Sequence, residues 1–257
     1  MRAILGARRP PRPTPLTDAA DAGGHTPTTC VIFGGMSPHL TLAILLIAVP
    51  VAFNLAYGLL AWRFSYPGIL RRPTAEILER FHAGGSGLRL LWWFFALTAL
   101  AFLPIPVLAA ELVPDRAVAT LGLVVGVVAA LVQGLGLIRW VFLVPHLARE
   151  SQAGADPRTV DLVFQSFHRY LGVAVGEHLG YLGTGAWTIL IALGAAPLLP
   201  AWLVISGVVI GLMLLVGALE FVGPFEERGW AFAGILVPVA YVLWSLWLIA
   251  LGVLLLT

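Results

Sequence analysis

Three ionisable residues stand inside long apolar stretches of this sequence: Arg139, Glu177 and His178. Ionisable side chains are costly in lipid, so within membrane-crossing helices they mark substrate, ion or proton sites by default. Arg139 lies ten residues before Arg149, and Glu177 lies eight residues after Arg169. At a rise of about 1.5 Å per residue, both side chains are expected about 10–15 Å from the same end of their helices. Because these helices are consecutive and antiparallel, we expect Arg139 and Glu177 to form an ion pair.

Further polar residues are predicted to share this level. The chain's only asparagine, Asn54, lies nine residues before the next basic residue, and Gln133 lies somewhat deeper. On the helix of Glu177, Tyr181 and Thr184 continue a polar stripe through the apolar layer, as the lining of a cavity or path would. The predicted ligand or ion site therefore comprises Arg139, Glu177, His178, Tyr181, Asn54, Gln133 and Thr184.

Another face of the same helix carries four glycines, which are Gly172, Gly176, Gly180 and Gly183. Small residues let a neighbouring helix approach closely. This face is therefore predicted to pack against another helix, and no further role is assigned to it.

The polar residues have two main interpretations. In one, they bind or move a small solute, an ion or a proton. In the other, an ion pair and interhelical hydrogen bonds only fix helix packing, in a structural, accessory or sensing protein. A third class, an intramembrane enzyme acting on a lipid, usually carries clustered carboxylates, and the acidic residues here are scattered. We therefore predict no catalytic residue and favour a non-enzymatic role.

No cofactor or metal is predicted either. Haem ligation by His146 and His178 would need both imidazoles at one depth, and the helical rise separates them by roughly 10 Å. The Glu177-His178 dipeptide lacks the partner histidine of the zinc-hydrolase pattern. The single cysteine, Cys30, excludes an intramolecular disulfide and any multi-cysteine metal site.

The composition indicates a chain that is covered largely by lipid. It is 60% hydrophobic and 11% charged, whereas soluble domains are about 45–50% apolar and about 25% charged. The net charge of +2 gives no dense basic face for nucleic acid. All 15 basic residues are Arg, which indicates the coding bias of a GC-rich bacterial genome. The expected partners are membrane lipids and a small-molecule or ion ligand, and the oligomeric state stays open.

Six apolar runs predict an all-α, polytopic bundle of six transmembrane helices, since each run is near the ~20 residues that cross a bilayer. Nine arginines lie in the loops after the first, third and fifth runs, against one, Arg116, on the other side. The positive-inside rule therefore predicts an inner-membrane protein with these loops in the cytoplasm and both termini outside. The runs are 39–62, 88–110, 117–144, 171–195, 199–219 and 230–256.

Two cytoplasmic loops contain helix signals. The first follows Pro73-Thr74 and ends at Gly84-Gly85; the second has Asp156 as a suitable N-cap and Pro157 at the first helical position. Both segments are amphipathic, so we predict short helices lying in the membrane interface.

Residues 1–35 differ from the remainder, which forms the predicted membrane domain 36–257. Their many Arg and Pro residues cannot bury apolar surface, so disorder is expected. The alternative is that translation starts at Met36, directly before the first apolar run, and that the tail is a start-site artefact.

Three stretches of the sequence are familiar as a set: 66–73, 139–147 and 170–180, together with Leu243-Trp244-Ser245-Leu246-Trp247. They resemble an uncharacterised bacterial family of multi-pass membrane proteins, domain of unknown function 4386, over about residues 37–256. The resemblance implies a membrane location and supplies no activity and no catalytic residues.

Overall fold

The computed structural model describes residues 37–225 and 229–257. The predictions for the tail 1–35, for Cys30 and for Arg228 concern residues outside these ranges.

All secondary structure in the described residues is helical, which confirms the all-α prediction. Five helical stretches are long and apolar enough to cross a membrane, with mean hydropathies of 2.0 to 2.5. They are α1 (Pro38–Phe64), α3 (Gly85–Ala101) with α4 (Pro104–Ala109) and η3 (Ala110–Leu112), α5 (Arg116–Gln152), α8 (Ala201–Gly217) with η5 (Ala218–Phe221), and α9 (Ala231–Leu254).

The run at 171–195 folds differently from a plain α-helix. Here α6 (Pro157–Phe167) continues without a break into a π-helix, η4 (His168–Leu179), and then into α7 (Gly180–Gly194). Alone, α7 has 15 residues, which is shorter than the ~20 that cross a bilayer. The sixth span therefore stays a prediction.

Both predicted loop helices are present. The first is α2 (Thr74–Ala83), which follows the short η2 (Gly68–Arg71), and the second is α6. Asp156 caps α6 as predicted, since its carboxylate accepts a hydrogen bond from the Thr159 amide at 3.0 Å. The two helices contact each other, because Gln165 Nε2 donates to Thr74 Oγ1 at 3.0 Å. A last short turn, η6 (Gly223–Phe225), precedes α9.

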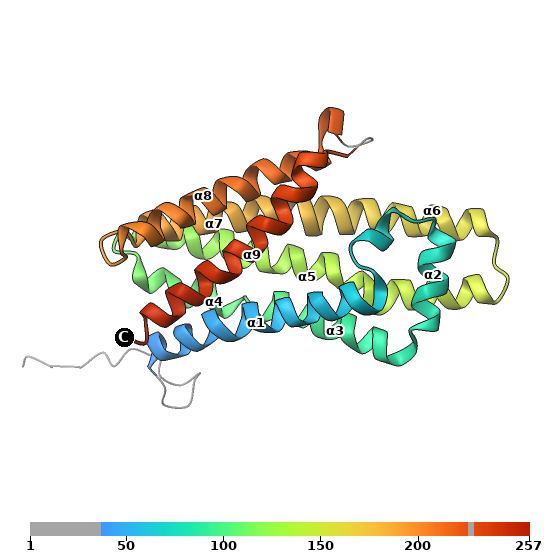
Figure 1. Ribbon diagram of the computed structural model, residues 1–257, viewed down its shortest axis with the longest axis horizontal. Helices are drawn as coiled ribbons and strands as arrows, with labels where there is room; N and C mark the ends of the chain where they lie inside the picture. The colour runs from blue at the N-terminus through green and yellow to red at the C-terminus, as the bar shows by residue number, and fades with distance from the viewer. Residues whose placement is uncertain (1–36, 226–228) are drawn as a thin grey trace, which may run out of the picture. The chain divides into compact units, whose positions relative to one another are not determined.

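The long helices form a closed ring in chain order. Helix α1 packs on α3, α3 on α5, α5 on α7, α7 on α8, α8 on α9, and α9 returns to α1. Figure 1 shows the last step, with α9 lying beside α8 and crossing α1. A ring of this kind directs one face of every helix towards a common interior.

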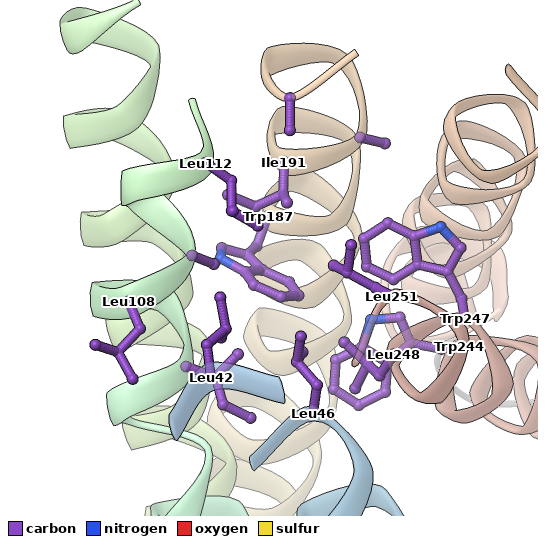
Figure 2. Close-up of a cluster of buried hydrophobic side chains, with 14 of the residues drawn as sticks. Leu42, Leu46, Leu108, Leu112, Trp187, Ile191, Trp244, Trp247, Leu248 and Leu251 are labelled. Atoms are coloured by element: carbon purple, nitrogen blue, oxygen red, sulfur yellow. The ribbon is translucent and has the colours of Figure 1, made fainter. Parts of the chain in front are cut away.

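Two hydrophobic cores fill different levels of the ring. The first core includes Trp187, Trp244 and Trp247 with leucines of α1, α4 and α9, as Figure 2 shows. The second core joins the end of α1 to α2, α3, α5 and α6, and its centre is a stacked pair, Trp92 and Trp140, with ring centroids 4.4 Å apart.

Candidate functional site

The polar residues occupy the level between the two cores. Along α5, Ala130 belongs to the first core and Trp140 to the second, and Gln133 lies between them with Arg139 at the edge of the second. Along the continuous helix from α6 to α7, Phe164 belongs to the second core and Trp187 to the first. Glu177, His178, Tyr181 and Thr184 all fall between these two positions. This order along the two helices agrees with the level expected from residue counting, and the site itself stays a prediction.

Arg139 is held by its own helix and by the start of η4. Its side chain is 7% exposed. Nη1 donates to the carbonyl of Gly136, Nη2 lies 3.3 Å from His168 Nδ1, and Cζ lies 5.4 Å from the ring centroid of Trp140. The guanidinium fits because the facing residue is Gly172, where an added Cβ would stand 2.5 Å from Cζ.

The expected ion pair between Arg139 and Glu177 is wrong. The ion pairs that the structure holds among the described residues are Arg80–Glu76 and His146–Glu150, both between neighbouring turns of one helix. Arg139 bends back to Gly136 and across to His168. Its charge still acts on Glu177 through space, so the two residues share a level without touching.

Glu177 is a carboxylate without a direct partner among the described residues, since no hydrogen bond or ion pair reaches it there. It lies deep in the bundle and yet keeps part of its side chain accessible. Tyr66, Tyr181 and Tyr241 lie within electrostatic range of it. Tyrosines of three different segments therefore lie near one acid that has no direct partner among the described residues.

His178 faces away from this acid. Its Nδ1 lies 2.9 Å from the carbonyl oxygen of Ala218, in η5. A carbonyl oxygen only accepts hydrogen bonds, so Nδ1 carries the proton. His178 is therefore engaged in packing η4 against η5, and the structure separates it from the Arg139 contact.

Gln133 and Thr184, two residues of the predicted site, contact each other directly. Gln133 Nε2 donates to Thr184 Oγ1 at 2.9 Å, and Tyr241 OH donates to Gln133 Oε1 at 3.5 Å. The network continues to the first core, where Trp244 Nε1 donates to Thr188 Oγ1 at 2.9 Å. These bonds link α5, α7 and α9, which is the behaviour of interhelical hydrogen bonds that fix packing.

Asn54 has a separate partner. Its Nδ2 donates to Ser245 Oγ at 2.9 Å and to the carbonyl of Pro50 at 2.7 Å. It ties α1 to α9, and among the described residues no hydrogen bond joins it to Glu177.

Three residues near the site, which are Tyr66, His168 and Tyr241, were not among those predicted from the sequence. His168 lies just before the predicted span that begins at residue 171. Its ring nevertheless contacts Arg139. Tyr241 lies near the middle of the last apolar run, and a single tyrosine among apolar residues does not by itself indicate a site. Its spacing of four from Ser245 was the available signal, because both residues face the interior of the ring.

The glycine face packs as predicted. An added Cβ at Gly136 would stand 2.5 Å from the Cα of Gly176, and one at Gly183 would stand 2.8 Å from the Cβ of Ala129. At the far end, a Cβ at Gly122 would lie 3.4 Å from Ile191. The prediction of close helix packing is confirmed.

The described part of the chain holds no group of three or more His, Cys, Asp or Glu residues placed to hold a metal ion. Two hollows lined by described residues lie elsewhere: one of about 630 Å³ runs along the first turns of α5, and one of about 410 Å³ lies between α1 and α3.

Five long apolar helices around a buried polar layer define an α-helical integral membrane protein. A family model, "Domain of unknown function (DUF4386)", matches residues 41–252. The chain belongs to this family, which confirms the resemblance. The search of the curated proteins and the search of the solved structures found no match.

Proposed function

We propose that this protein is a six-span inner-membrane protein that binds or moves a small solute or ion at Glu177. The observation that carries the proposal is an unpaired carboxylate in the interior of a helix ring, deep in the bundle and still partly accessible. A purely structural acid would be expected in a direct ion pair, because desolvating an unpaired charge is costly. An open acid is instead what a site needs for an incoming partner.

The run of contacts along α5 supports the sixth span. Gly176, Gly183 and Ile191 lie against Gly136, Ala129 and Gly122 in that order, so η4 and α7 run antiparallel to α5. From residue 136 to residue 122 a helix rises about 21 Å, most of a ~30 Å hydrocarbon core.

The arginine distribution supports cytoplasmic loops after spans one, three and five, with both termini outside. The contact between α2 and α6 agrees with this topology, because it requires the first and third loops to lie on one side. Lying at the cytoplasmic interface, α2 and α6 would turn their exposed, charged faces to water.

The alternative, a structural polar layer, is favoured by one observation, the Gln133–Thr184–Tyr241 network. This network explains why those residues are polar. It does not explain Glu177, which no described hydrogen bond includes.

Chemical modification tests the proposal. Dicyclohexylcarbodiimide is an apolar reagent that enters membranes and modifies carboxyl groups in apolar surroundings. We expect the purified protein in lipid nanodiscs to be modified at Glu177, and mass spectrometry of the peptides locates the adduct. Glu76 is the matched control, because it is ion-paired with Arg80 at 3.0 Å on a loop helix. An unmodified Glu177 in the folded protein would overturn the proposal.

A further inference from the structure

Aromatic rings form a continuous arc beside Glu177. Tyr66 contacts Tyr57, which contacts Phe53, with ring centroids 5.6 and 6.4 Å apart. Phe53 lies 6.2 Å from Tyr241, and Tyr241 lies 5.4 Å from Tyr181. The arc ends at Phe221 of η5, 5.6 Å from Tyr181.

The members of this arc come from both ends of the sequence. Phe53 and Tyr57 belong to α1, Tyr66 to the turn after it, Tyr181 to α7 and Tyr241 to α9. Phe221 belongs to η5, and all six members keep some accessible surface although they lie inside the bundle. Aromatic side chains that only filled the core would be expected to be fully buried, as Trp92 and Trp140 are at 0% exposure.

Glu177 and the described residues that act electrostatically on it together carry more negative than positive charge. Glu177 and Glu220 lie within electrostatic range of each other and of Tyr181. Arg139 is the cation within range of Glu177, and its guanidinium is already engaged with His168, Gly136 and the Trp140 ring. Among the described residues that act on Glu177, one acid and one already engaged cation are thus added to its own charge, and a positively charged ligand would complement this set.

We propose that the Glu177 site binds a monovalent organic cation, an alkylammonium or quaternary ammonium group, between the Glu177 carboxylate and the faces of Tyr181 and Tyr241. Aromatic faces attract ammonium groups through the ring quadrupole, and such groups need no directed ligands. A metal cation would instead need several oxygen ligands to replace its water. This inference rests on the proposed function and specifies the chemistry of its ligand.

Binding measurements on the full chain in nanodiscs test this inference. The probes are choline and 3,3-dimethylbutan-1-ol, which share a shape and differ in the charge of one atom, and isothermal titration calorimetry measures both. We expect saturable binding of choline and at least about tenfold weaker binding of the neutral alcohol, the size of a moderately desolvated cation–π contact. Absent choline binding, or equal binding of the two probes, would overturn the inference.

Three variants assign the binding to the proposed groups. Glu177→Gln and Tyr241→Leu should each weaken choline binding at least about tenfold, whereas Tyr241→Phe keeps the aromatic face and should retain it. Glu76→Gln serves as the matched control for loss of an acid and should bind choline as the unmodified protein does. Glu177→Gln binding as tightly as wild type would overturn the inference, and circular dichroism confirms that each variant is folded.

The two proposals fail in different ways. If carbodiimide modifies Glu177 and choline gives no protection, the site exists and the ammonium chemistry is wrong. If carbodiimide leaves Glu177 unmodified in the folded protein, the proposed function fails, and this inference fails with it.

Discussion

At the scale of single residues, Arg139 and Glu177 have different tasks although they share a level. Arg139 has a hydrogen-bond acceptor, a histidine neighbour and an aromatic face within reach. Glu177 has only through-space influences among the described residues. The shared depth could be predicted from residue counting. The contact partners could not be predicted, because Arg139 bends into the space that Gly172 leaves open. The depth of a residue in the membrane does not determine the direction of its side chain.

Gly172→Ala should displace the Arg139 side chain. The added Cβ would stand 2.5 Å from Cζ of Arg139, well inside contact distance. We expect the free energy of unfolding to fall by about 1–3 kcal/mol, which is the usual cost of overpacking. Thermal unfolding in detergent measures this change. Gly58→Ala is the matched control, since an added Cβ there meets nothing within 4 Å. Equal stability of the two variants would contradict the placement of Arg139.

At the scale of elements, the apolar runs predicted the helices well, because length and hydropathy decide membrane-crossing segments. The π-helix was not predictable. Its turns hold more residues than those of an α-helix, so the α-helical period does not describe the segment His168–Leu179. Trp92 and Trp140, although near the ends of predicted spans, are both fully buried in the second core.

The N-terminus of α6 should depend on pH through Asp156. Hydrogen bonds from the Thr159 hydroxyl and amide hold the pKa of this carboxyl below its ordinary value. A depressed folded-state pKa stabilises the protein above the unfolded-state pKa, about 4, and this stabilisation is lost as the pH falls through the folded-state value.

Asp156→Ala should therefore lower the Tm at pH 7, and the difference from wild type should shrink below about pH 4. Asp156→Asn is the control, because an asparagine still caps the helix without titrating. Scanning calorimetry across this pH range measures the Tm of each protein. A Tm difference between wild type and Asp156→Ala that does not change with pH would contradict the proposed role of the Asp156 carboxylate.

At the scale of the whole membrane domain, ring closure is what brings Tyr66, Tyr181 and Tyr241 to one acid. The order of the spans follows from the sequence. The return of α9 to α1 does not, because it depends on contacts between residues nearly two hundred positions apart, such as Asn54 and Ser245. Site residues on α1 and α9 were accordingly the hardest to predict.

The topology can be read by cysteine labelling in cells, with Cys30 replaced by serine. Arg116→Cys should react with a membrane-impermeant maleimide added to intact spheroplasts, because residue 116 begins α5 at the end that the proposed topology places outside. Arg80→Cys on α2 should react only after permeabilisation. The reverse pattern would overturn the predicted orientation.

The central claim, that Glu177 is an open acid and not half of a structural pair, is tested most directly by the stability of Glu177→Gln. A broken buried ion pair typically costs about 3–5 kcal/mol. Among the described residues the carboxylate has no direct partner. We therefore expect the free energy of unfolding in detergent to change by less than about 1 kcal/mol, because the lost attraction to Arg139 is offset by the removed desolvation of the acid. Arg139→Leu should lose stability by itself, and adding Glu177→Gln should not restore it. A large loss in Glu177→Gln that the double variant recovers would contradict the account.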